Sequence, residues 1–326
     1  MAAPRPTPWG RAGRAARRAG RAGKRAGRAI RRGAVRAVEP LRRVGGIERA
    51  VLLHHREDLL RKRTFGPADL DLLRALLASA DAVIPVREAF ERQAALPERL
   101  IALRHDMDHD VENSVRFAEW EAQLGFRSTY EVLHTDWYYR RGARGGPSRF
   151  VLRALDRIAA LGHEIALHNN AIAAALLQDR DPFEILEEEL AHLRQHGHEI
   201  VGTVAHGDRM CRDLGFNNSE LFVVCPDPSG RDPMREIVRI DPVTGRRTAV
   251  RLAPVPMTRF GLTHEAMVFG NVHYLSDTGG RWHRPFDEVA GAYARDGGFL
   301  QILAHPVWWA LGGEPFTPRA TADPAR

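Results

Sequence analysis

The chain has 326 residues, of which 44% are hydrophobic, so it is long enough to fold into one large domain or two ordinary ones. Its formal net charge is +7, but residues 1–46 contain 14 Lys and Arg residues and a single acid, Glu39, so this arm carries +13 and the rest of the chain −6. That distribution excludes the uniformly basic surface of a nucleic-acid-binding domain.

The basic arm, residues 1–46, is built mainly from Arg, Ala and Gly, and we expect it to be disordered because its apolar face is weak. Its charge predicts either a solvated extension or attachment to an anionic partner, namely a membrane face, a nucleic acid or a polyanionic glycan. The chain has no run of about 18 apolar residues, which predicts no transmembrane segment. It has only two cysteines, Cys211 and Cys225. We therefore expect a cytoplasmic protein that can reach a membrane through its arm.

Beyond the arm, short apolar runs alternate with amphipathic segments. Helices are expected at 47–63, 67–79, 111–124, 148–161, 182–197 and 285–296, and strands at 100–103, 126–133, 164–167, 200–205 and 299–303. Residues 221–281 break this alternation and predict a β-rich insertion, with a turn at 241–245. We take 47–312 as the catalytic domain and 313–326 as a loose tail. The alternation is typical of a parallel α/β sheet or barrel, in which functional groups lie where strands end.

Acids and histidines follow four of the predicted strands. They are Asp106, Asp108, His168, His206 and His305. Helix capping explains Asp110, which precedes a predicted helix, and a lone histidine after a strand is more often structural than functional. Four strand ends that each supply Asp or His are a different pattern. They form a natural ligand set for Zn²⁺ with an open water position, and the remaining Asp and His suit a base and an acid.

Three short segments carry a resemblance to a known family. Residues 104–108 (Arg-His-Asp-Met-Asp), 162–168 (Gly-His-Glu-Ile-Ala-Leu-His) and 303–306 (Leu-Ala-His-Pro) resemble, in this order, the first, second and last motifs of the polysaccharide deacetylases, or carbohydrate esterase family 4. The resemblance covers roughly residues 98–308. It implies a distorted (β/α) barrel of fewer than eight strands and metal-dependent hydrolysis of an N-acetyl, occasionally an O-acetyl, group on a sugar.

The resemblance also implies residue roles. By position, Asp106 is the general base, Asp108 and His168 are metal ligands, and His305 is the acid that protonates the departing amine. Asp277, in a segment that resembles the family's acid-and-tryptophan motif, lines the groove and tunes His305.

The sequence departs from the family at two motifs. Ile172 stands where the family has its second ligand histidine, so we expect His206 after the next strand to complete the ligand set. The family's arginine motif is missing, and Arg209 is the expected replacement. His163 is expected to pack beneath the site rather than to bind metal, and Trp308 to stack on a sugar ring.

Together these features predict a metal-dependent hydrolase, with Zn²⁺ as cofactor, that removes an N-acetyl group from an amino sugar or glycan precursor. Two alternatives stay open. One is a C–N hydrolase that acts on a non-sugar amide, and the other is a catalytically silent carbohydrate-binding barrel. Metal content distinguishes the enzymes from the silent barrel, and a substrate panel distinguishes the two enzymes.

Overall fold

The computed structural model describes residues 58–92, 98–139, 146–227, 229–268 and 273–317. The chain divides into two units, Met1–Asp58 and Leu59–Arg326, and the fold belongs to the second. The basic arm and residues 47–57 of the expected helix at 47–63 lie outside the described residues and stay predictions, while residues 58–60 are helical and the helix ends before the expected residue 63. Among the described residues, no helix combines the length and the apolar character needed to cross a membrane.

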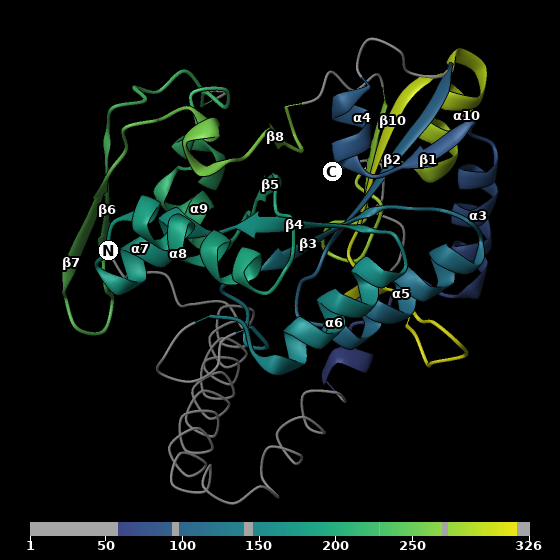
Figure 1. Ribbon diagram of the computed structural model, residues 1–326, viewed down its shortest axis with the longest axis horizontal. Helices are drawn as coiled ribbons and strands as arrows, with labels where there is room; N and C mark the ends of the chain where they lie inside the picture. Colours follow the sequence, from purple (N-terminus) through teal and green to yellow (C-terminus); the bar gives the residue numbers. More distant parts are fainter. Residues whose placement is uncertain (1–57, 93–97, 140–145, 228, 269–272, 318–326) are drawn as a thin grey trace, which may run out of the picture. The chain divides into compact units, whose positions relative to one another are not determined.

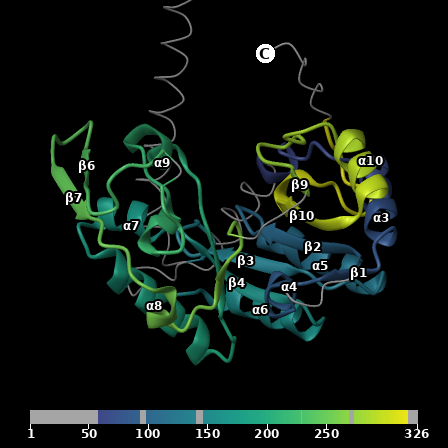
Figure 2. The same ribbon diagram turned by 90° about the horizontal axis from the view of Figure 1, so that it is seen from above.

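The second unit is built on a parallel sheet that curls into a half-barrel (Figures 1 and 2). Along the sheet the strands run in the order β8 (His264–Glu265), β5 (Gly202–Ala205), β4 (Glu164–Asn169), β3 (Thr129–Leu133), β2 (Arg99–Asp106), β10 (Gly298–Ala304) and β9 (His273–Ser276). An eighth strand, β1 (Ala82–Ile84), pairs with the first half of β2, beside the place where β3 pairs with its second half. The fold is therefore α/β with a curled parallel sheet, the coarse architecture predicted from the sequence.

The strands β2, β4 and β10 are longer than predicted, whereas β3 and β5 begin later than the predicted residues 126 and 200. β2 continues from the predicted 100–103 through Arg104, His105 and Asp106, because all three pair with β3 and the first two also pair with β10 on the other side. Parallel sheets with both faces covered bury nearly every residue, and β2 is buried along its whole length after Arg99. The extension matters because it places Asp106 at the carboxyl end of the strand.

Five predicted helices are confirmed within one or two residues of their expected bounds. They are α3 (Pro67–Ala78), α5 (Val111–Gln123), α6 (Arg149–Ala160), α8 (Pro182–Gln195) and α10 (Phe286–Asp296). Two of these helices are capped at their N-termini by an aspartate side chain. Asp110 accepts a hydrogen bond from the amide of Asn113 in α5, and Asp181 accepts hydrogen bonds from the first amides of α8. α6 packs against β4 and α10 against β9, so these helices cover the sheet (Figure 2).

Three short helices add to the predicted pattern. They are α4 (Val86–Glu91), α7 (Ala171–Gln178) and α9 (Arg209–Leu214). α7 has no polar stripe, because its first six residues are all buried in the core. It packs against α8 and against the strand β7 described next. Three single-turn 3₁₀ helices, η3 (Asn218–Leu221), η4 (Met257–Phe260) and η5 (Pro306–Trp308), lie in the connections.

The segment 221–281 contributes strands to two different sheets. β6 (Glu236–Ile240) and β7 (Arg247–Arg251) form an antiparallel hairpin around the expected turn at 241–245. β8 and β9, by contrast, belong to the main sheet, where β8 pairs with β5 and β9 with β10. Within the described residues, the separate sheet thus consists of this one hairpin, which lies beside α7 and α9 in Figure 1.

The first part of the expected loose tail is held against the domain. Glu314 forms ion pairs with Arg63 and Arg116, and the amide of Thr317 donates to the carbonyl of Arg63 at 2.9 Å. Arg63 is itself buried, so these contacts hold Glu314 and Thr317, in the first part of the expected tail, against the domain. Residues 318–326 lie outside the described part of the chain.

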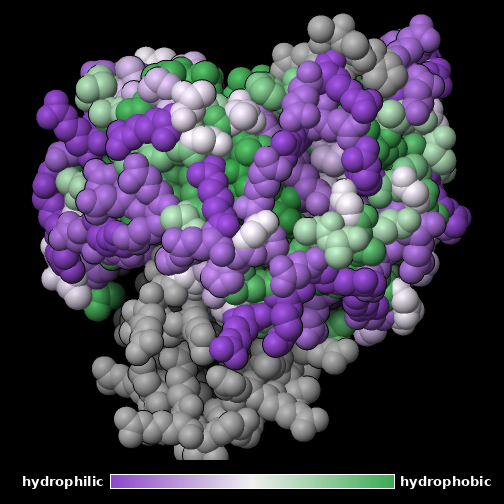
Figure 3. Space-filling view, viewed as in Figure 1, coloured by the Kyte–Doolittle hydropathy of each residue, from purple (hydrophilic) through white to green (hydrophobic). Residues whose placement is uncertain are grey.

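The face of the molecule in Figure 3 is mainly hydrophilic, with hydrophobic atoms between the polar groups near its middle.

Candidate functional site

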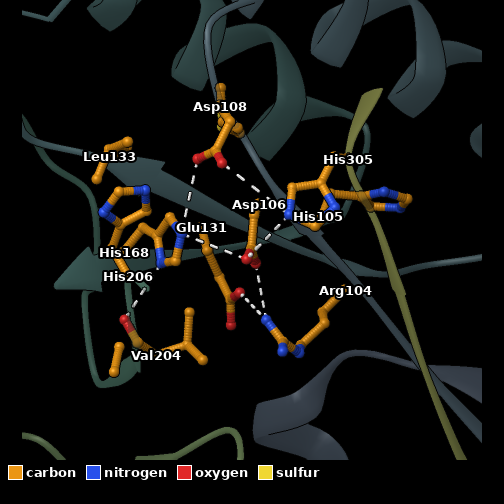
Figure 4. A network of polar contacts seen from close by, with 12 residues as sticks. Arg104, His105, Asp106, Asp108, Glu131, Leu133, His168, Val204, His206 and His305 are labelled. Carbon is orange, nitrogen blue, oxygen red and sulfur yellow. Dashed lines mark hydrogen bonds and ion pairs between the residues drawn. The ribbon is translucent and has the colours of Figure 1, made fainter. Parts of the chain in front are cut away.

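The predicted site residues lie along the carboxyl edge of the sheet. Asp106 is the last residue of β2, His168 is the second to last of β4, and His206 follows β5. His305 follows β10, and Asp277 follows β9. Because the described strands of the main sheet all pair in parallel, these ends share one edge, where the side chains of Asp106, Asp108, His168, His206 and His305 gather (Figure 4).

Three of these side chains form a candidate metal centre. One ligand atom from each of Asp108, His168 and His206 lies within 4.8 Å of the other two. His168 Nε2 is 3.6 Å from Asp108 Oδ1, and the His168 and His206 rings are perpendicular with centroids 4.9 Å apart. The spacing suits three donors around one cation, since zinc–ligand distances of about 2.0–2.2 Å put neighbouring ligand atoms some 3–4 Å apart.

The hydrogen bonds of the three residues test whether they fit a cation. His168 Nδ1 lies 3.3 Å from the carbonyl of Val204, an arrangement that leaves Nε2 free to ligate. Asp108 Oδ1 and His206 Nδ1 are shielded from solvent and have no hydrogen-bond partner within the described residues. Burial, and then the nearby His168, lower the pKa of His206, which favours the neutral imidazole that binds metals. One carboxylate and two imidazoles fit a divalent cation of the Zn²⁺ type.

Asp106 lies beside this candidate centre and is built to stay ionised. Its Oδ2 is 3.3 Å from His168 Nε2 and 3.6 Å from His305 Nε2, and its Oδ1 is 2.7 Å from Arg104 Nη1. Burial favours the neutral acid, but the electrostatic interactions with His168, Arg104 and His305 outweigh it and hold the pKa of Asp106 well below its usual range. An ionised carboxylate at this point can accept a proton.

Arg104 joins Asp106 to a second buried acid, Glu131. The same Nη1 of Arg104 lies 2.7 Å from Glu131 Oε2, and burial raises the pKa of Glu131 well above its usual range. We did not predict either residue as part of the site. Two signals are present in the sequence and fold: Arg104 is two residues before Asp106 and so shares its face of β2, and Glu131 is the register partner of Asp106 on β3.

His305 is held by Asp277 from the neighbouring strand end. His305 Nδ1 is 2.5 Å from Asp277 Oδ1, and the backbone amide of His305 donates to both carboxylate oxygens. Burial alone would lower the pKa of His305, but Asp277 raises it to about 9, with further help from Asp106 and Asp108. Trp309 donates its indole N–H to Asp277 Oδ2 at 2.7 Å, so the carboxylate is fixed from several sides. A protonated His305 with a free Nε2 facing Asp106 can donate a proton.

The two remaining predicted site residues lie in short helices that follow β5 and β10. Arg209 is the first residue of α9, with a side chain that is 85% exposed and paired with Asp213 one helical turn later. It therefore does not replace the missing arginine, and Arg104 is the arginine that contacts Asp106. Trp308 is the last residue of η5, and its ring lies close to Gly280.

The remaining expectations concern residues set aside as ligands. His163 is buried beneath the sheet, where its Nδ1 lies 3.1 Å from Ser128 Oγ and its Nε2 lies 3.0 Å from the carbonyl of Ala118. Ile172 is fully buried in the apolar cluster around α7. Neither side chain takes part in the candidate centre.

Comparison with protein-family models, with curated proteins and with solved structures gives no match to this chain in any of the three. Fold and site together therefore define the class of protein: an α/β half-barrel with an Asp/His cluster, suited to a divalent cation, at the carboxyl ends of its strands.

Proposed function

We propose that this protein is a metal-dependent hydrolase that removes an N-acetyl group from an amino sugar or glycan precursor. The observation that carries the proposal is the position of Asp106, which lies within 3.3–3.6 Å of a candidate metal ligand, His168, and of a candidate acid, His305. Hydrolysis of an amide needs these three things at one point: a group that activates the carbonyl, a base for the attacking water and an acid for the leaving amine.

Asp108, His168 and His206 would hold a divalent cation such as Zn²⁺, which would supply polarisation of the acetyl carbonyl and stabilisation of the negative charge that develops on its oxygen. Asp106, ionised at neutral pH, accepts the proton of the attacking water. His305 donates a proton from Nε2 to the departing amine nitrogen, while Asp277 holds its Nδ1.

Supporting residues keep these two groups in opposite protonation states. Arg104 provides a permanent positive charge beside Asp106 and so favours the carboxylate. Asp277 favours the imidazolium of His305. Two titratable groups whose surroundings push their pKa values apart are the usual arrangement of a base and an acid, and this arrangement argues against a catalytically silent barrel.

The proposal is tested with the purified full chain, by elemental analysis of its metal and by acetate release from a panel of N-acetylated amino sugars and non-sugar acetamides. We expect about one zinc per chain and release from the sugars. Asp106→Asn should keep the metal and lose about 10²–10⁴-fold in rate. Asp213→Asn, a change of the same kind at an exposed carboxylate, is the matched control and should alter neither.

Three results would decide against the proposal. If the wild-type protein binds no divalent metal, the candidate centre is not a metal site. If Asp106→Asn keeps full activity, Asp106 is not the base. Acetate release from the non-sugar acetamides alone transfers the function to the alternative, a C–N hydrolase of a different substrate class.

A further inference from the structure

A layer of buried asparagines lies next to the candidate metal centre. Asn218, the first residue of η3, has no exposed surface and comes from a connection that none of the predicted motifs includes. Its side-chain Nδ2 donates to the carbonyl of His206 at 2.8 Å and to Asn170 Oδ1 at 2.9 Å. Its own carbonyl accepts from the side chain of Asn169 at 3.0 Å. This one residue therefore contacts both the loop of His206 and the end of β4.

The side-chain oxygen of Asn218 caps the N-terminus of α7, a helix to which Asn218 does not belong. Oδ1 accepts hydrogen bonds from the amides of Ile172 at 3.0 Å and Ala173 at 3.3 Å, in the first turn of α7. Asn170, the residue that precedes α7, makes no side-chain capping bond of its own. Free amides in the first turn of a buried helix need such partners. Asn218 thus ties the start of α7 to the loop that follows β5.

The loop is held by its backbone rather than by the His206 side chain. The amide of His206 donates to the carbonyl of Asn169 at 2.8 Å, and its carbonyl accepts from Asn218. The ring, by contrast, has no hydrogen bond to Nδ1 within the described residues. The direction in which His206 points is therefore set by its backbone bonds, of which the one from Asn218 is the shorter of two to its carbonyl; the other comes from Cys211 Sγ at 3.7 Å.

We propose that Asn218 is a positioning residue for the metal centre, which fixes His206 as the third ligand by joining its carbonyl to α7 and β4. The inference rests on the proposed function, because it assumes that Asp108, His168 and His206 bind a cation. It also connects two features of the chain: Ile172 contributes no ligand, but its amide is one of the groups through which Asn218 is anchored.

The test is Co²⁺ binding by the metal-free full chain, measured by titration of the visible absorption bands, which respond to the number and geometry of the ligands. In Asn218→Asp, an oxygen stays available to the amides of α7, but the donor to His206 is lost. Asn218→Ser is the second variant, in case the first does not fold. We expect Co²⁺ binding about 10- to 100-fold weaker, with altered bands, as is typical when a partner outside the ligand set is removed.

The matched control is Asn113→Asp. Asn113 is buried to the same degree, and its Nδ2 donates to the carbonyls of Pro306 and Trp309, away from the three ligands. It should lose stability as Asn218→Asp does, while Co²⁺ affinity and bands stay as in the wild type. In a His206→Ala background, Asn218→Asp should cause no further loss of affinity, because the residue through which it acts is gone.

The possible outcomes separate the two proposals. If the wild type binds no Co²⁺, the proposed metal-dependent function fails and this inference with it. If the wild type binds but Asn218→Asp and Asn218→Ser behave like Asn113→Asp, only the inference is overturned. It is likewise overturned if the loss of affinity persists unchanged in the His206→Ala background, because Asn218 would then act on the fold in general.

Discussion

Arg104→Met tests whether a buried cation holds the carboxylates of the site in place. Arg104 Nη1 lies 2.7 Å from Asp106 Oδ1 and 2.7 Å from Glu131 Oε2, and all three side chains are at most 8% exposed. Methionine keeps an unbranched apolar side chain in the same space but removes the charge. Asp106 and Glu131 then face each other in the interior without their shared counterion.

The expected cost follows from the burial of this cluster. Removing one partner of a buried ion pair typically lowers the free energy of unfolding by about 3–5 kcal/mol, a large part of the roughly 5–15 kcal/mol of a whole domain. The cost should depend on pH. The pKa of Asp106, which burial would raise, is held low by His168 and Arg104, so the stability it contributes is present above its unfolded pKa and lost as the pH falls. Wild type and variant should therefore converge in acid.

Urea unfolding of the metal-free protein, followed by circular dichroism at pH 7.5 and at pH 2.5, which lies below the ordinary aspartate pKa of 3.8, measures both effects. Arg247→Met is the matched control, because Arg247 pairs with Glu236 at 2.9 Å on the surface, with both side chains more than half exposed. Such a pair contributes about 0–1 kcal/mol. A loss below about 1 kcal/mol for Arg104→Met at pH 7.5, or an equal loss at both pH values, would show that the cluster does not work as argued.

Two further predictions concern titration. His305 must be protonated to act as an acid, so activity should fall as the pH rises through its pKa of about 9. Asp277→Asn should lower this pKa and so move the descending limb of the pH–rate profile to lower pH. A limb that does not move would contradict the role of Asp277. Burial raises the pKa values of Cys211 and Cys225 to about 12, so both thiols should react with iodoacetamide at pH 8 far more slowly in the native protein than in urea, as mass spectrometry can show.

Sequence patterns predict the helices of this fold well where one face differs from the other. α6 alternates buried and exposed positions, and Ser148 caps it, so both its course and its start can be read from the residues. α7 carries no such contrast: its first six residues are apolar or small and all buried, so the sequence does not distinguish it from a loop within the core. β8, with two residues, is too short for any periodicity.

The site was predictable to the extent that the sheet determines it. Asp106, His168, His206 and His305 follow apolar runs, and in a parallel sheet such positions meet at one edge. Arg104, Glu131 and Asn218 could not be found in this way. Arg104 and Glu131 meet only through the register of β2 and β3, and Asn218 reaches Ile172 across 46 residues of sequence. Contacts of that kind depend on packing, which a single sequence does not display.

The origin of the three candidate ligands explains why the site needs such packing. Asp108 and His168 follow or end strands whose mutual position is set by the sheet, with His168 in register with Val204 of β5. His206 lies one residue beyond β5, where its amide still donates to Asn169 of β4 but its carbonyl is bonded by Asn218 instead of by a strand. A ligand at Ile172 would instead have to place an imidazole in the apolar cluster around α7, where an unpaired polar group is costly. A ligand in the loop leaves that cluster apolar, but it requires a hydrogen bond that replaces the lost strand pairing, and Asn218 provides one.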